Sequence, residues 1–123
     1  MKYDMSATER EIMEVLWEKG EKTMVRDIMD IFTERGKHWK RQTLNTFLAR
    51  LEEKELITRE PGRVEACFSK KVYQSRCCQE ILELNFDGKF TNFFCAFYDG
   101  KPITEKEAEE MLALIERKKK ELQ

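Results

Sequence analysis

A change of pattern near Leu56 constrains the fold more than any other feature of the sequence. Before it, apolar residues recur three and four positions apart in three successive segments, which predicts three amphipathic helices. After it, two short segments rich in strand-forming residues, Leu56–Arg59 and Val64–Phe68, flank a turn that contains Pro61 and Gly62. The order therefore predicts three helices followed by a two-stranded hairpin.

Capping residues and glycines mark the ends of the first two helices. Ser6 and Glu9 form a capping box at the start of the first helix, and Gly20 ends it. Thr23 is expected to cap the second helix, and Gly36 to end it. Three helices and a hairpin are the layout of a winged helix-turn-helix. The expected fold class is therefore mostly α with a small β-hairpin wing.

Two regions are expected, a winged-helix DNA-binding domain over 1–70 and a helical dimerisation region over 71–123. The second region predicts a helix over 71–85 and a last helix that begins at the capping box of Thr104 and Glu107. It has too few residues to enclose its apolar side chains, so a second copy of the chain is expected to cover them. The expected dimerisation residues are Phe90, Phe93, Phe94, Phe97, Met111, Leu112 and Ile115.

Composition excludes several classes of protein. With 41% hydrophobic and 38% charged residues the chain is typical of soluble domains, and no apolar run reaches the roughly 18 residues of a membrane span. The amino-terminal residues lack a signal-peptide pattern, so a cytoplasmic protein without membrane insertion is expected. The four cysteines lack C-x2-C spacing and His38 is the only histidine, so we expect no metal and no cofactor. Without a nucleophile or phosphate-loop motif, no enzyme is expected.

Charge is distributed unevenly along the chain. Residues 35–71 hold 10 basic and 5 acidic side chains, a net charge of +5, although the whole chain has a net charge of −1. The stretch from Arg35 to Leu51 contains no carboxylate at all. A basic segment at the start of a helix is what binding to a phosphate backbone requires.

The third helix, expected over about 40–54, has an outward face suited to reading bases. If Leu44, Phe47, Leu48 and Leu51 face the core, then the opposite face shows threonine, asparagine, glutamine and arginine, which can contact base edges. Arg63 at the wing is expected to reach phosphate or the minor groove. The expected DNA-binding residues are Lys40, Arg41, Gln42, Thr43, Asn45, Thr46, Arg50 and Arg63.

The pattern of these residues resembles that of a known protein family. The segment from Trp39 to Leu51, WKRQTLNTFLARL, is similar to the pattern W-x-x-x-T-I/V-x-T-L/M-L-x-R-L of the penicillinase repressors. Glu9 to Trp17 resembles the first helix of that family, and Gly62 and Arg63 resemble its wing. The resemblance implies a cytoplasmic homodimer that binds a palindromic operator and represses transcription, in a family that regulates antibiotic resistance.

The resemblance also implies regulation by a protease sensor. Many members are cleaved between Asn and Phe shortly before the last helix. The corresponding bond here joins Ala96 and Phe97, so this sequence departs from the family pattern by lacking the Asn. A related branch senses copper through C-terminal C-x-C motifs, which this sequence lacks after Cys95, so no copper site is expected.

Two alternatives remain beside the repressor. A metal- or thiol-responsive regulator of the same fold would use Cys77, Cys78 and Cys95, and the metal content of reduced protein would distinguish it. A winged-helix protein-interaction module would not bind DNA, and salt-dependent binding of duplex DNA would exclude it.

Overall fold

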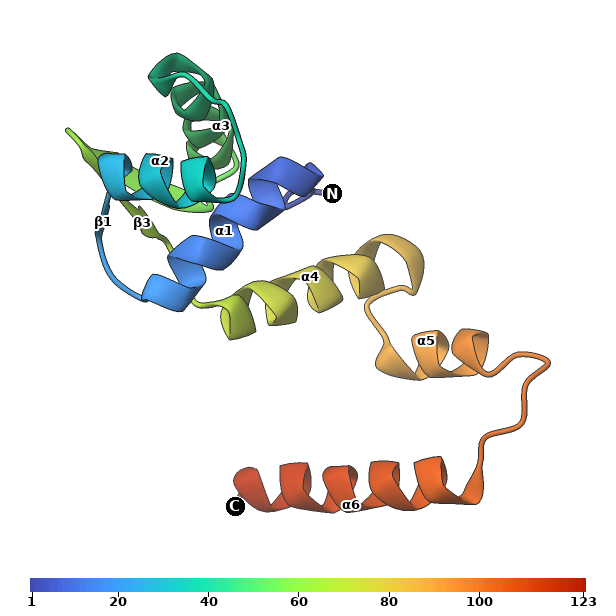
Figure 1. The fold of residues 1–123 in the computed structure, drawn as a ribbon. Coiled ribbons are helices and arrows are strands. Elements are labelled where there is room, and N and C mark those ends of the chain that lie inside the picture. Colours follow the sequence, from blue (N-terminus) through green and yellow to red (C-terminus); the bar gives the residue numbers. More distant parts are fainter. The chain divides into compact units, whose positions relative to one another are not determined.

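The amino-terminal helices and strands share one hydrophobic core (Figure 1). The computed structural model describes all 123 residues, which form two units, Met1–Glu80 and Ile81–Gln123. The elements of the first unit are α1 (Ala7–Lys19), β1 (Thr23–Met24), α2 (Val25–Glu34), α3 (Arg41–Glu53), β2 (Ile57–Glu60) and β3 (Arg63–Ala66). The mostly helical fold with a hairpin wing, predicted from the sequence, is confirmed.

The sheet has three antiparallel strands in the order β1-β3-β2, one strand more than the sequence predicts. The expectation that Thr23 caps α2 is wrong, because Thr23 pairs with Val64 in the sheet and its hydroxyl donates to the Glu21 carbonyl. Strand pairing satisfies the Thr23 backbone and buries its β-branched side chain. Met24 takes the N-cap position instead, with no side-chain hydrogen bond.

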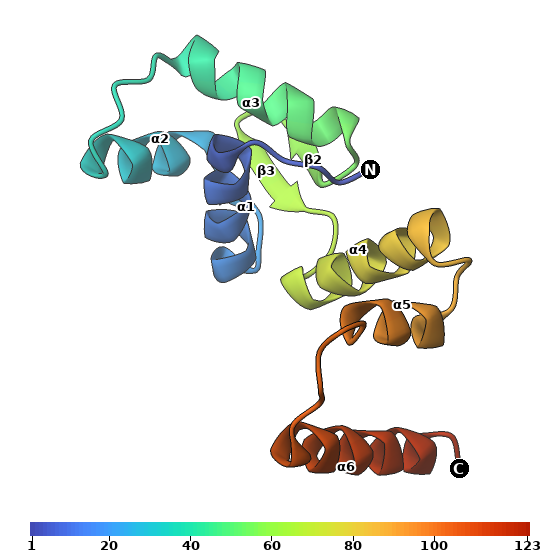
Figure 2. The ribbon, with the colours of Figure 1, turned by 90° about the vertical axis from the view of Figure 1, so that its right-hand side faces the viewer.

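The core of the first unit is built from one face of each helix together with the hairpin. In α3, Leu44, Leu48 and Leu51 are fully buried, as the helical spacing predicts. Phe47 is only half-buried and packs on Trp39, with ring centroids 5.5 Å apart. Figure 2 shows α3 beside β2, an arrangement that turns the opposite side of the helix toward solvent.

The remaining helices are α4 (Lys70–Asn85), α5 (Phe90–Phe97) and α6 (Glu105–Glu121), and α4 continues across the boundary between the units. No residue of α5 or α6 is buried. The predicted capping box is present, because the Thr104 hydroxyl accepts a hydrogen bond from the Glu107 amide. No helix combines the length and the apolar character needed to cross a membrane.

One partly buried ion pair joins the start of α1 to the end of α3. The Glu9 side chain is 5% exposed, and its Oε2 accepts a hydrogen bond of 2.6 Å from Lys54 Nζ, which also donates to the Asp4 carbonyl. Burial raises the pKa of Glu9, but the hydrogen bonds from Lys54 and Ser6 together outweigh burial and hold that pKa below its ordinary value of 4.5. The hydrogen bond from Lys54 is the largest of the contacts that keep Glu9 ionised.

We expect Lys54→Met to lower the free energy of unfolding by about 2–4 kcal/mol at neutral pH, because it leaves a buried carboxylate without its partner. Lys22→Met is the matched control, since Lys22 and Glu60 form an exposed pair, and it should change the denaturation midpoint little. Urea denaturation measures both variants.

The same variant has a defined pH dependence. Because the pKa of Glu9 is lowered in the folded protein, the stability from its ionisation is present above 4.5 and is lost as the pH falls through the folded value. The difference between wild type and Lys54→Met should therefore shrink on acidification. A difference that stays constant down to pH about 3 would show that the ion pair is not its cause.

Candidate nucleic-acid interface

The outward face of α3 carries the residues that are predicted from the sequence to contact bases. Burial of the leucine stripe leaves Thr43, Thr46 and Arg50 exposed along one side of the helix, three and four residues apart. Gln42 and Asn45 are exposed beside them. This face is therefore exposed along the length of the helix.

Two of these side chains are held by the helix itself. The Thr46 hydroxyl donates to the Gln42 carbonyl at 3.0 Å, which leaves its oxygen as an acceptor and its methyl group exposed. The Arg50 guanidinium lies 6.0 Å from the centroid of the Phe47 ring. Both side chains thus make a local contact within the helix.

The amino-terminal end of α3 is positively charged. Its N-cap, Lys40, has an extended backbone and makes no side-chain capping bond, and no acidic residue occurs in the first turn. The first helical amides and the helix dipole therefore add to the charges of Lys40 and Arg41. Such an end attracts an anion such as a phosphate.

Ion pairing separates the basic residues of the first unit into two groups. Carboxylates pair with Lys22, Arg59 and Lys54 at 2.7, 3.0 and 2.6 Å. The cations selected from the sequence take part in no ion pair. They are Lys40, Arg41, Arg50 and Arg63. Their charge is therefore available to a partner.

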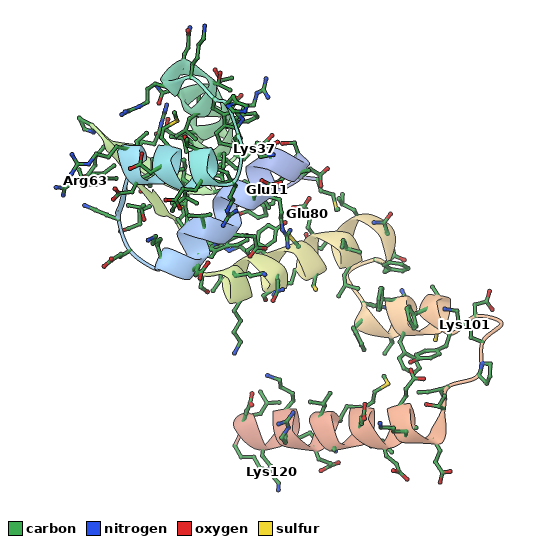
Figure 3. The ribbon with its side chains drawn as sticks, viewed as in Figure 1. Glu11, Lys37, Arg63, Glu80, Lys101 and Lys120 are labelled. Carbon is green, nitrogen blue, oxygen red and sulfur yellow. The ribbon has the colours of Figure 1, made fainter.

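A groove between α3 and the hairpin brings part of this set together. Arg41 and Asn45 from α3 and Arg63 from β3 line the same hollow, beside the turn at Gly62. Figure 3 shows Arg63 at the edge of the first unit. The other selected residues of α3 do not line this groove. They lie on the exposed surface of the helix next to it.

Arg26 is a further candidate that the sequence analysis missed. It is exposed, takes part in no ion pair and lies in the first turn of α2, two residues after Met24, which pairs with Arg63. The Val25 amide also donates to the Gly62 carbonyl at 2.9 Å. Only the β1–β3 pairing places Arg26 near the hairpin turn, and a two-residue strand has no periodicity to reveal it.

The predicted dimerisation residues lie in the second unit. Phe90, Phe97, Leu112 and Ile115 are at least half exposed. Phe93, Phe94 and Met111 are half-buried. The Phe93 ring of α5 lies near the rings of Phe90 and Phe97 in the same helix and of Phe86 before it, with centroids 5.8, 6.1 and 5.5 Å apart. Ala96 and Phe97 lie in the last turn of α5, and both are exposed.

The cysteines are dispersed over both units. Cys67, Cys78 and Cys95 are exposed and Cys77 is half-buried. Burial, with nearby carboxylates, raises the pKa of the Cys67 thiol. No group of three or more His, Cys, Asp or Glu side chains is arranged to hold a metal ion.

Comparison with known proteins identifies the family. The model of the penicillinase repressor family matches residues 5–117, which is nearly the whole chain. No curated protein sequence matches it significantly. The match includes α3, the hairpin and all the unpaired cations described above. The chain therefore belongs to the penicillinase repressor family, a family of DNA-binding transcriptional repressors.

Proposed function

We propose that the protein is a homodimeric repressor that binds a palindromic operator, with residues 1–70 on the DNA and residues 71–123 at the dimer interface. The observation that supports it best is the surface of α3, which combines unpaired cations with short polar side chains. Arginine, glutamine and asparagine make paired contacts to base edges, and unpaired lysine and arginine neutralise phosphates. The proposed DNA-binding residues are Lys40, Arg41, Gln42, Thr43, Asn45, Thr46, Arg50 and Arg63.

Dimerisation through the second unit is supported by its exposed apolar side chains. α6 buries no side chain within the chain, so a partner is needed to cover its apolar residues. Its apolar residues Met111, Leu112 and Ile115 share one face. A second copy packed on this face would bury them, and its two-fold symmetry matches a palindrome.

We expect the double substitution of Leu112 and Ile115 to Asp to convert a dimer into a monomer. The charged groups cannot be buried in an apolar interface without a large desolvation cost. Operator affinity should fall by a factor of about 10²–10⁴, because the two half-sites are then bound independently. Ala113→Asp, on the opposite face of α6, is the matched control. Sedimentation of the full-length proteins at micromolar concentration measures the change, and a wild-type monomer would refute the dimer.

We expect Arg50→Ala and Thr46→Ala to weaken binding to the operator more than binding to random duplex. Loss of a good base contact costs about 1–3 kcal/mol and relaxes the preference at that base pair. Lys40→Ala should weaken binding to both DNAs equally. It should also reduce the slope of log affinity against log salt concentration by about one for each protomer's contact. Mobility shifts at several salt concentrations separate the two effects.

Lys19→Ala is the control for these variants, because Lys19 is an exposed, unpaired cation at the far end of α1. It should leave both affinities unchanged. If Arg50→Ala keeps the ratio of operator to random binding, then α3 is not the element that reads the bases. Binding that is insensitive to salt would contradict the DNA-binding proposal itself.

We expect a regulatory protease to cut the bond between Ala96 and Phe97. Both residues are exposed, and their position in the last turn of α5 means that only a short stretch of helix must open. The cut would separate α6 from the first unit and so abolish dimeric binding. Mass spectrometry of the repressor isolated from induced cells would show a fragment ending at Ala96, and intact repressor in induced cells would contradict it.

A further inference from the structure

A single buried residue anchors α4 to the first unit. Among all residues of α4, only Tyr73 is buried. The helix begins directly after the hairpin, where the Ser69 hydroxyl accepts a hydrogen bond from the Val72 amide. Little apolar packing therefore determines the direction in which α4 leaves the first unit.

Polar and aromatic contacts with α1 supply that direction. The Tyr73 hydroxyl accepts a hydrogen bond of 3.1 Å from Arg10 Nη1, and the Tyr73 and Trp17 rings lie 5.0 Å apart. Arg10 also lies over the Tyr73 ring at 5.3 Å. Glu14 contacts both Arg10 and Lys70, at 3.3 and 3.0 Å, and so connects α1 to the first turn of α4.

The amino-terminal segment holds the next turns of the same helix. Arg76 donates to the Tyr3 hydroxyl at 3.3 Å and lies 4.3 Å from the centroid of the Phe68 ring. Glu80 accepts a hydrogen bond of 2.7 Å from the Lys2 amide. A hollow of about 400 Å³ lies beside these contacts and is lined by Tyr3, Arg10 and Tyr73, among other residues. It leaves α4 space to tilt when a contact is removed.

We propose that Arg10 and Tyr73 are positioning residues that select the spacing between the two operator half-sites. They hold α4 against α1 and thereby relate the direction of α4 to that of the recognition helix. Neither residue belongs to the proposed DNA-contacting set. The proposal rests on the proposed function, because spacing has a meaning only for a dimer on a two-part operator.

The length of α4 makes a small tilt consequential. From Tyr73 to Asn85 the helix rises about 18 Å, so a tilt of about 10° moves its far end by about 3 Å. That displacement is close to the rise of one base pair, about 3.4 Å. A loosened contact at Tyr73 would therefore let the dimer accept operators whose half-sites are one base pair closer or farther apart.

The test measures the affinity of full-length protein for duplexes with altered spacing. The half-site is first selected by the wild-type protein from a random duplex pool, and two inverted copies are then placed at five successive spacings. The variants are Tyr73→Phe, which keeps the ring and removes the hydroxyl, and Arg10→Gln. Lys19→Gln removes a charge from the same helix without touching α4 and is the matched control. Arg10→Lys, which keeps a donor, should restore part of the preference.

Wild type and Lys19→Gln should bind the best spacing at least about 100-fold more tightly than spacings two base pairs away, because a mismatch prevents simultaneous engagement. Tyr73→Phe and Arg10→Gln should reduce this ratio to about 10-fold or less, while their affinity for a single half-site stays unchanged. The proposal is overturned if the ratio of affinities between the best and the mismatched spacings is unchanged in these variants, whether or not their affinity falls equally at every spacing.

Two further results keep the proposals apart. A wild-type dimer that selects a half-site but binds all spacings equally would overturn the positioning role and leave the proposed function standing. A wild-type protein that selects no half-site, or that remains a monomer on DNA, would refute the proposed function. Thermal unfolding of each variant confirms that it is folded at the temperature of the binding assay.

Discussion

Burial of the leucine stripe of α3 sets the rotation of this helix about its axis, and the arrangement of the proposed interface depends on it. Leu44, Leu48 and Leu51 are fully buried, so the side chains on the opposite side face solvent. A rotation by one residue would turn Arg50 toward the core and expose a leucine, at a cost of several kcal/mol. The apolar contacts thus keep the polar face in the position that the proposed DNA contact requires.

The basic residues of the first unit then fall into those that pair with a carboxylate and those that do not. The Lys54–Glu9 pair holds a buried carboxylate and stabilises the junction of α1 with α3, and Arg59 is neutralised by Glu52 beside the wing. Lys40 and Arg63 have no such partner, although both lie within the same small unit. Pairing some cations internally leaves a smaller, localised set for the proposed phosphate contacts, and such a set favours a defined orientation on a duplex.

The helices after the hairpin differ from the first unit in how much of their apolar surface is buried. The first unit buries its own apolar surface, whereas α5 and α6 expose phenylalanine, leucine and isoleucine side chains. Between them, α4 is held to the first unit mainly by hydrogen bonds, ion pairs and aromatic contacts. Hydrogen bonds depend on direction as well as distance, which suits a helix that joins the proposed DNA-binding unit to the proposed dimerisation unit.

The sequence by itself determined the three helices, the hairpin, the outward face of α3 and the capping boxes. These features arise from residues within a few positions of one another, so their spacing is visible in one dimension. Only the tertiary structure decided that Thr23 joins a sheet, that Arg26 lies near the wing, and that Arg10 contacts Tyr73. These contacts join residues about 40 or more positions apart. A two-residue strand or a single hydrogen bond produces no periodic pattern in the sequence. Such partners can therefore be identified only in the folded chain.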